Sequence, residues 1–431
     1  MRLTVVGPLR TADTELLESV DRSPRHAVAH PTTGGARHGD WYVLRAGRTG
    51  ERGAGMTDQW HRTEEPLVLH VIPTTLARGA QREARALADE LDAPGLRAHR
   101  VLSLFDGPAE VRADLALGLP DGDQPGVGYN WRAVPRLRRA LGELDPVCVV
   151  AHGGEPLKYL VPAMAGHRRP LAYYAIGTYG ASAARRAQVL LWRRLLGRVD
   201  AVAAEGDEVA EECVHLLGVP AAKVTMTPNG RDPADFHPRT DGRSTDGPTI
   251  VFVGALTEGK RPDRFVHAIA ELRSRGLVFR AVLIGDGALR PAIEGPARAA
   301  DIELLGSRSD VAELLGRADV LVFPSRPQGE GMPGVLIEGG LSALPIVATD
   351  VPGVRSVIQD GTTGFVVDVD DLEAMVVSLA TLIEDDDLRR TMGTAARARC
   401  IEHFSIASVG ALWLRLLTPL LPPGAGATDA D

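Results

Sequence analysis

Two successive series of short apolar segments, each followed by a helical pattern, constrain the fold of this chain more than any other feature. In the first series the apolar segments are LVLHVIP, RAHRVLSLF, PVCVVAHGGE, PLAYYAIGT and DAVAAEG, and VTMTPNGRD closes it. Apolar runs of this length that alternate with helices predict the strands of a parallel sheet. Right-handed crossovers place the helices on the faces of such a sheet, so the first series predicts a doubly wound α/β domain.

A second series of the same kind begins after residue 248. Its apolar segments are TIVFVGAL, FRAVLIGDG, IELLG, DVLVFPS, PIVATD and GTTGFVVD, again with helical patterns between them. The segment PRTDGRSTDGP, which separates the two series, is polar and rich in Gly, Asp and Pro, as interdomain linkers are. A chain of 431 residues also exceeds the length that one hydrophobic core usually supports. We therefore expect two Rossmann-like domains with a cleft between them, and C-terminal helices that pack back toward the N-terminal domain.

The first 65 residues differ from the rest of the chain. They are rich in Arg, Gly, Thr and His, and their apolar runs are short and isolated, so we expect disorder there. We hypothesise that translation starts at Met56, or that residues 1–55 are dispensable. The expected organisation is an extension over 1–65, a first domain over 66–237, a linker over 238–248, a second domain over 249–400, a C-terminal helix over 401–421 and a disordered tail over 422–431.

Composition and charge exclude several classes of protein. The net charge is −8, whereas nucleic-acid-binding domains usually carry a basic patch or a basic overall charge. The three cysteines, Cys148, Cys213 and Cys400, are scattered along the sequence, which fits a reducing compartment. No apolar run is long enough to span a membrane, and the N-terminus has no apolar signal core. We expect a cytoplasmic protein. The segment LWRRLLGR at 191–198 favours a helix with solvated arginines, and leaves peripheral contact with the inner membrane face open.

Glycines and polar residues follow several of the predicted strands. In open parallel sheets, ligands bind beyond the carboxyl ends of the strands. In the second series Gly254, for which we expect a tight turn, and Lys260 follow the first strand. In the first series His152 and Glu155 follow the third strand and are candidate ligand-binding residues. A structural role for His152 stays open. The two sets of strand ends are expected to face each other, so that domain closure excludes water from a bound ligand.

The segment GEGMPGVLIEGG places two carboxylates, Glu330 and Glu338, around residues that are otherwise glycine, proline or apolar. Pro333 suits the start of a helix that we expect to run from Gly334 to Ala343. Uncovered N–H groups and the helix dipole attract an anion such as a diphosphate to this end. The carboxylates would then accept hydrogen bonds from the hydroxyls of a sugar and a ribose on either side. From spacing alone, a capping role for Glu330 and a surface position for Glu338 stay open.

This segment resembles the motif of two glutamates separated by seven residues in the family 4 retaining glycosyltransferases, which have the glycosyltransferase B fold. The similarity extends to VGALTEGKRPDRFVHAIAELR, LIGDG, ADVLVFPS, LPIVATDVPGV and DGTTGFVV in the second half, and to HVIPTTLARGAQRE and TPNGRDPADFHP in the first. It covers residues 66–415 and is more specific in the second half. The resemblance implies transfer of a sugar from a nucleotide-diphosphate sugar to an acceptor hydroxyl, with retention of the anomeric configuration.

Carried over position by position, the resemblance implies roles for individual residues. Glu330 would contact the donor sugar near the reacting carbon, Glu338 would bind the ribose, and Lys260 would neutralise the diphosphate leaving group. Gly79 would let the backbone of the first domain approach the same phosphates. The implied catalytic residues are Glu330 and Lys260. The donor-binding set is Gly79, Gly254, Lys260, Arg261, Glu330, Gly331, Met332, Pro333, Gly334, Glu338 and Gly353.

No metal or other cofactor is expected, because Lys260 and the helix end can do the electrostatic work of a metal. A retaining transfer without an obvious protein nucleophile suggests attack on the face from which the phosphate departs, through an oxocarbenium-like state. The acceptor is expected to be a sugar, a lipid-linked molecule or another small molecule, and His152 and Glu155 are the candidate acceptor-binding residues.

Two positions depart from the family pattern. Ala255 stands where the family usually has Arg, so the diphosphate loses a bidentate donor, and Arg261 is the candidate to compensate. Ile176 precedes Gly177 where the family often has a His. These departures keep open the alternative of a non-catalytic nucleotide-sugar-binding protein. Another alternative is a nucleotide-sugar epimerase, an enzyme with the same architecture. A two-lobed solute-binding protein is disfavoured, because no export signal is present.

Overall fold

The computed structural model of the chain describes residues 65–76, 79–92, 97–120, 129–177, 179, 186–238, 247–327 and 331–422. These residues all belong to one compact unit, Ala46–Asp431. The predictions for the N-terminal extension and Met56, for the centre of the linker and for the tail beyond residue 422 therefore lie outside the described residues.

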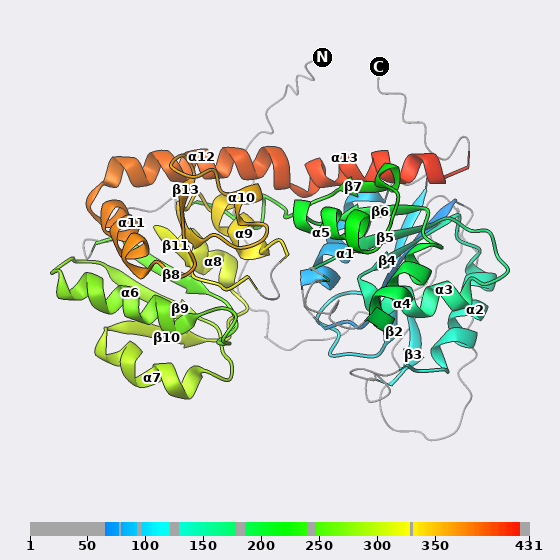
Figure 1. Ribbon diagram of the computed structural model, residues 1–431, viewed down its shortest axis with the longest axis horizontal. Coiled ribbons are helices and arrows are strands. Elements are labelled where there is room, and N and C mark those ends of the chain that lie inside the picture. The colour runs from blue at the N-terminus through cyan, green and yellow to red at the C-terminus, as the bar shows by residue number, and fades with distance from the viewer. Residues whose placement is uncertain are drawn as a thin grey trace, which may run out of the picture. The chain divides into compact units, whose positions relative to one another are not determined.

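The first domain is built on a sheet whose strands all run parallel (Figure 1). Within the described residues this sheet has seven strands in the order β3-β2-β1-β4-β5-β6-β7. The order reverses between β1 and β4, so the loops that follow these two strands diverge there. The strands are β1 (Leu67–Ile72), β2 (Ala98–Phe105), β3 (Leu115–Leu119), β4 (Cys148–His152), β5 (Leu171–Ala175), β6 (Ala201–Ala204) and β7 (Val224–Met226).

Strand β3 is the one strand of this sheet that the sequence does not predict. It lies at the edge of the sheet, and only Leu117 and Leu119 of its residues are buried. Gly118 has a φ of 67°, and the pairing of β2 with β3 shifts register between Ser103 and Phe105. A half-exposed edge strand that contains a glycine has no continuous apolar run, so the pattern that identifies the central strands is absent here.

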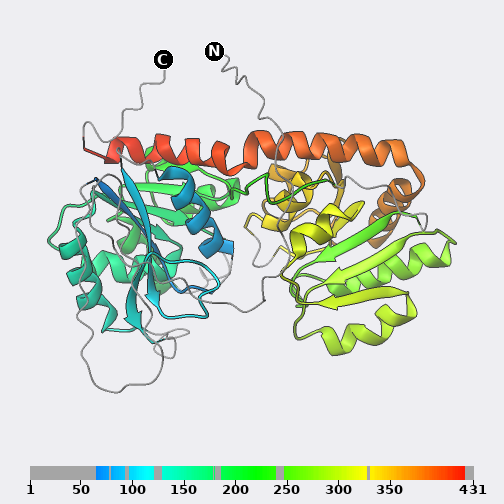
Figure 2. The same ribbon diagram turned by 180° about the vertical axis from the view of Figure 1, so that it is seen from behind.

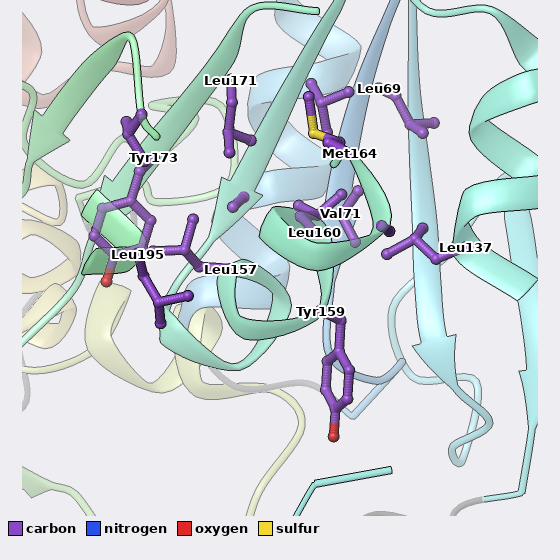
Figure 3. Packing of buried hydrophobic residues seen from close by; sticks show 14 of the residues in the cluster. Leu69, Val71, Leu137, Leu157, Tyr159, Leu160, Met164, Leu171, Tyr173 and Leu195 are labelled. Carbon is purple, nitrogen blue, oxygen red and sulfur yellow. The ribbon is translucent and has the colours of Figure 1, made fainter. Parts of the chain in front are cut away.

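Helices cover both faces of the sheet (Figures 1 and 2). They are α1 (Gly79–Leu91), α2 (Ala133–Leu144), α3 (Gly154–Ala163), α4 (Arg186–Leu196) and α5 (Asp207–Glu211), which continues into a π-helical turn at Glu212–Leu216, and a 3-10 turn follows at Ala221–Lys223. In α2 the buried residues Leu137, Leu141 and Leu144 recur at the spacing of one helix face. This face packs into the core around Leu69 and Val71 of β1 (Figure 3).

The second domain repeats the arrangement, and its six strands are those that the sequence predicts. Among the described residues their order is β10-β9-β8-β11-β12-β13, all parallel, with the reversal between β8 and β11. The strands are β8 (Thr249–Val253), β9 (Arg280–Ile284), β10 (Ile302–Gly306), β11 (Val320–Phe323), β12 (Ile346–Thr349) and β13 (Gly364–Val367). The helices are α6 (Pro262–Ser274), α7 (Arg290–Ala299), α8 (Val311–Gly316), α9 (Gly334–Leu341), α10 (Val354–Val357) and α11 (Leu372–Glu384).

Two further helices, α12 (Asp386–Phe404) and α13 (Ile406–Leu417), follow one another and end in a 3-10 turn at Thr418–Leu420. The helix expected over 401–421 is thus the end of α12 and the whole of α13, because Ser405 leaves the helical conformation and caps α13 through a bond from the Ser408 N–H. Trp413 and Val409 of α13 pack with Val68 of β1, as the expected return to the first domain requires. None of the described helices combines the length and the apolar character needed to cross a membrane.

A row of three buried histidines crosses the centre of the first sheet. His70 of β1 bonds through Nδ1 to His152 Nε2 of β4 and through Nε2 to His99 Nδ1 of β2, both at 2.9 Å. None of the three is more than 1% exposed. Burial lowers the pKa of all three, to about 3 for His99 and His152, and the positive charges of Arg97 and Arg100 add to the effect at His99. The row is therefore neutral in the folded protein near neutral pH.

Replacing His152 by Phe should destabilise the protein less at pH 5 than at pH 7. The unfolded chain protonates this histidine as the pH falls below 6.5, while the folded state does not until about pH 3. The stability contributed by the neutral side chain is therefore present above pH 6.5 and lost on acidification. The difference in the free energy of unfolding between parent and variant should shrink by roughly 2 kcal/mol from pH 7 to pH 5 in urea titrations. The exposed His403, replaced by Phe, is the control, and an equal difference at both pH values would contradict the expectation.

Candidate functional site

The glycine-rich segment before α9 follows the carboxyl end of β11. Glu330 lies outside the described residues, so its contact with a sugar stays a prediction. Pro333 directly precedes the helix, and α9 begins at Gly334 as expected. The helix ends at Leu341 and not at Ala343, because Ala343 takes a left-handed backbone conformation with a φ of 59°.

Three glycines of the predicted donor-binding set lie where other parts of the chain approach the backbone. Gly353 has a φ of 78°, and a Cβ built on it would lie 2.0 Å from the Gly331 carbonyl oxygen. A Cβ on Gly331 would lie 1.7 Å from Glu205 Oε1, and one on Gly334 would lie 2.2 Å from Arg231 Nη2. Side chains of the first domain therefore reach the backbone of the second only because these positions are glycine.

Both backbone polar groups of Met332 bond to side chains of the first domain. Asn229 Nδ2 donates to the Met332 carbonyl at 2.9 Å, and the Tyr174 hydroxyl donates to Asn229 Oδ1 at 3.0 Å. The Met332 N–H donates to the carboxylate of Glu205, which also accepts from the Gly177 N–H at 2.5 Å. The segment that leads into α9 is thus held by residues that follow β5, β6 and β7.

The carboxyl group of Glu205 is almost completely enclosed at this contact, with 3% of the residue exposed. Burial raises its pKa to about 7, and the hydrogen bonds from Gly177, Met332 and Asn229 limit the rise, because they favour the charged form. Glu205 therefore changes its charge near neutral pH, directly against the backbone of the predicted donor-binding segment.

A second contact between the domains centres on Arg231. Its Nε donates to Glu338 Oε1 at 2.9 Å, and its Nη1 donates to Glu83 Oε2 at 3.1 Å. The side chain of Glu83 has no exposed surface, and burial raises its pKa to about 7 against the opposing effect of Arg231. The side chain of Glu338 is only 18% exposed. The alternative of a solvated surface position for Glu338 therefore does not hold.

Lys260 and Arg261 lie in the turn between β8 and α6. Lys260 Nζ lies 5.1 Å from the ring centre of Phe323, the last residue of β11. This position is the carboxyl edge of the sheet between β8 and β11, where the strand order reverses. Arg261 has a φ of 51°, a conformation that glycine adopts most readily, and its guanidinium pairs with Asp263 at 3.2 Å. The side chain expected to compensate for Ala255 is thus engaged with a carboxylate of its own helix.

The chain bends at Gly254, directly after β8, but the surroundings of this residue do not require a glycine. Its φ lies outside the left-handed region, and a Cβ there would meet Phe252 at 3.4 Å, an ordinary contact. The constrained residues are Gly285 and Gly287, with φ of 138° and 158°. Their Cβ atoms would lie 1.9 Å from the Gly254 carbonyl oxygen and 2.7 Å from that of Leu256. The turn after β9 therefore packs onto the backbone at Gly254, and the steric requirement belongs to the GDG turn.

The three predicted site residues of the first domain have different surroundings. Gly79 begins α1, and among the described residues a Cβ on it would meet nothing within 4 Å. Glu155, in the first turn of α3, pairs with Lys158 at 2.7 Å. His152 is 1% exposed, and its ring stacks on Trp413 of α13. An enclosed side chain presents no surface to an acceptor, so the structural role that the sequence left open for His152 is the one observed.

A cavity of about 420 Å³ lies beside Gly353 and is lined by both domains. Asp207 and Glu208 of α5 contribute from the first domain, and Asp350 and Arg355, paired at 2.8 Å, contribute from the second. Among the described residues, no group of three or more His, Cys, Asp or Glu side chains is placed to hold a metal ion.

Sequence reasoning misses four residues of this contact, namely Glu83, Glu205, Asn229 and Arg231. Glu205 lies within the quoted segment DAVAAEG and directly follows strand β6, so the rule that identified His152 would also have identified it. Asn229 and Arg231 lie within the quoted segment TPNGRDP. Glu83 carries no comparable signal, because it is one of several charged residues in α1 and only the packing shows that it is buried.

Replacing Glu205 by Gln should raise the free energy of unfolding of the variant relative to that of the parent protein as the pH rises. The folded state keeps the Glu205 proton up to about pH 7, whereas the unfolded chain releases it near 4.5, so the parent protein loses stability as the pH rises through 7. Glutamine does not titrate. The free energy of unfolding of the variant, relative to the parent, should therefore rise by roughly 2–3 kcal/mol between pH 5 and pH 8 in urea titrations. The exposed Glu313, replaced by Gln, is the control, and a difference that stays constant with pH would refute the assignment.

Two family models match the chain, one in each domain. The model described as "Glycosyltransferase Family 4" matches residues 77–235, and the model described as "Glycosyl transferases group 1" matches residues 247–385. Together they span both sheets and the glycine-rich segment before α9.

Individual relatives agree with the family models. One relative is the GDP-mannose-dependent alpha-(1-6)-phosphatidylinositol monomannoside mannosyltransferase of Mycolicibacterium smegmatis. The two sequences are 28% identical over 304 residues, and this alignment covers 66% of this chain and 79% of that protein. Another relative is the UDP-Gal:alpha-D-GlcNAc-diphosphoundecaprenol alpha-1,3-galactosyltransferase of Escherichia coli. This chain is 26% identical to it over 216 residues, and the alignment covers 46% of this chain and 55% of that protein. Several further matches span half of the relative's length or less.

A solved structure has the same arrangement of two domains. HepE of Anabaena, crystallised in complex with UDP and glucose, is similar with a TM-score of 0.68 at 18% sequence identity, over 81% of this chain and 99% of that chain. At this identity the similarity shows the fold. The two parallel sheets, the family matches in both halves and this similarity establish that the chain belongs to the family 4 glycosyltransferases and has the glycosyltransferase B fold.

Proposed function

We propose that the protein transfers a hexosyl group from a nucleotide-diphosphate sugar to an acceptor hydroxyl, with retention of the anomeric configuration and without a metal. The observation that carries this proposal is the meeting of Gly331, Gly334 and Gly353 at the start of α9, with Glu338 one turn into the helix. Gly334 would let an anion approach the first N–H groups of α9, beyond the Met332 N–H that Glu205 already holds, and the helix dipole would add to the attraction.

The donor would lie with its diphosphate at the amino end of α9. Lys260, at the carboxyl edge between β8 and β11, would neutralise the charge that grows on the leaving phosphate. Glu338 would accept hydrogen bonds from the ribose, and Glu330 would do so from the sugar hydroxyls near the reacting carbon. Gly79 would bring the first amides of α1 to the same phosphates from the first domain.

Retention would follow from attack on the face that the phosphate leaves. In this step the bond from the anomeric carbon to the phosphate oxygen breaks, the bond to the acceptor oxygen forms, and the departing phosphate oxygen takes the acceptor proton. The protein would contribute positioning and charge stabilisation.

The acceptor is proposed to be a sugar or a lipid-linked molecule. The names of both relatives described above include a lipid-linked acceptor, phosphatidylinositol monomannoside in one and a diphosphoundecaprenol in the other. In α4, Leu190 and Leu191 are 65% and 56% exposed, close in sequence to the exposed Arg193 and Arg194. Apolar side chains beside arginines suit an anionic lipid surface, which supports peripheral membrane contact of a protein that we propose to be cytoplasmic.

The proposal is tested with a panel of nucleotide sugars, scored by calorimetric binding and by release of nucleoside diphosphate with and without acceptors. Release that depends on an acceptor, and a product with the donor's anomeric configuration in its NMR spectrum, would support it. A converted sugar from the donor alone would indicate the epimerase, and binding without turnover would indicate the non-catalytic protein that the departure at Ala255 keeps open.

Replacing Lys260 by Ala should lower kcat by about 10²–10³-fold, because removing one preorganised donor to a developing negative charge has an effect of this size. The measurement is the rate of nucleoside diphosphate release at saturating donor, with circular dichroism to verify the fold. Lys223→Ala is the matched control, because Lys223 Nζ bonds to the Val199 carbonyl of the first domain at 2.9 Å. Full turnover of the Lys260 variant would remove this residue from the proposed mechanism.

A further inference from the structure

Arg231 lies where two chain segments pass between the domains side by side. Its N–H donates to the Phe404 carbonyl at 2.9 Å, and its carbonyl accepts from the Ile406 N–H at 2.8 Å. The segment after β7 is therefore paired with the junction of α12 and α13. Because the backbone of Arg231 is held on both sides, its side chain starts from a defined position between the two domains.

The side chain links a buried carboxylate of α1 to the carboxylate proposed to bind a ribose. Nη1 donates to Glu83 Oε2 at 3.1 Å and to the Gly230 carbonyl at 2.8 Å. The other oxygen of Glu83, Oε1, accepts from the Gly230 N–H at 2.8 Å. Both oxygens of Glu83 are thus engaged, and Oε2 together with the Gly230 carbonyl holds Nη1 of Arg231. Nε then meets Glu338 Oε1 at 2.9 Å. The missing Cβ of Gly334 makes room for the remaining nitrogen.

We propose that Arg231 is a positioning residue that orients the Glu338 carboxylate toward the ribose of the donor, and that Glu83 anchors Arg231 in this task. This inference rests on the proposed function. Oε1 of Glu338 takes the guanidinium bond, and within the described residues Oε2 makes no hydrogen bond, so Oε2 is left for a ribose hydroxyl. A carboxylate restrained at one oxygen presents the other in one direction, which lowers the entropy lost when the hydroxyl binds.

The charge of Arg231 serves the same task. Glu83 and Glu338 bring two carboxyl groups close to a helix end that is proposed to hold a diphosphate. A buried carboxylate without a partner is costly, and it repels an incoming anion. The guanidinium lies between them, and its Nε bonds to Glu338 Oε1 at 2.9 Å, so the Glu338 carboxylate has a cationic partner at low exposure. A ribonucleoside diphosphate is the ligand class that this arrangement selects.

The test distinguishes an orienting role of Arg231 from a merely structural role. It compares the affinity for a nucleoside diphosphate with the affinity for an analogue that lacks the ribose hydroxyls. The dissociation constants of the nucleoside diphosphate that binds best in the donor panel, and of its 2′,3′-dideoxy analogue, are measured by calorimetry for the parent protein and for Arg231→Met. The parent should prefer the ribonucleotide at least 10-fold, and the variant should lose most of this preference. An arginine that only holds the domains together would weaken both ligands equally and leave the ratio unchanged, which would overturn the inference.

Because Arg231→Met leaves the buried Glu83 without its partner, the double variant Glu83→Gln/Arg231→Met is measured as well. The double variant has no unpaired carboxylate at position 83. It should show the same loss of preference for the ribonucleotide over its dideoxy analogue, while still binding inorganic pyrophosphate. Arg169→Met is the matched control, because Arg169 has a similarly buried side chain, 17% exposed, that pairs with Asp145 and makes no contact with Glu338. The control should keep the ratio of the parent, and a lowered ratio in the control would overturn the inference.

Glu338→Gln distinguishes failure of this inference from failure of the proposed function. If Glu338→Gln loses the preference and both Arg231 variants retain it, Glu338 binds the ribose without help from Arg231, and only the inference is overturned. If Glu338→Gln retains the preference, the ribose is not read by Glu338, and the proposed donor geometry fails together with the inference.

Discussion

The parallel pairing of every strand in both sheets determines where this protein can hold a ligand. Parallel neighbours need crossover helices, which cover the sheet faces and leave the carboxyl edges of the strands as the open parts of each domain. In the first domain, Gly177, Glu205 and Asn229 all lie beyond this edge, after β5, β6 and β7. Met332, which follows β11 in the second domain, bonds to the latter two. The topology therefore brings residues from four strand ends to one place.

The contact between the domains is unusual in its chemistry, because buried carboxyl groups and an arginine meet backbone there. Burying charge is costly even when it is paired, and apolar side chains of similar volume often give equal stability. The Glu83–Arg231–Glu338 set is therefore better explained by the geometry that it imposes than by stability. Glycines make the geometry feasible, since any Cβ at Gly331 or Gly334 would overlap with Glu205 or Arg231.

Much of the fold follows from periodicity, and the exceptions have physical causes. All six strands of the second sheet contain apolar runs and are predictable, including the edge strand β10, of which only Ile302 is buried. In β3, buried and exposed residues alternate and Gly118 interrupts the apolar run. In the site, the start of α9 at Gly334 follows from Pro333. The role of His152 does not follow from its place at a strand end, because the packing of α13 covers it. Gly254 and Gly285 are equally plausible turn residues in the sequence, and only the packing shows which one lacks room.

The sequence by itself determined the two α/β domains, the return of the C-terminal helices, the family resemblance and the glycine-rich helix start, because these depend on patterns that extend over one strand or one helix. Only the tertiary structure decided which carboxylates meet that helix start. Arg231 and Glu338 are 107 positions apart, and Arg231 and Glu83 are 148 positions apart. Such pairs form only when the packing of whole domains has set the distance between their backbones. The helix or strand propensity of a local segment contains no information about that distance.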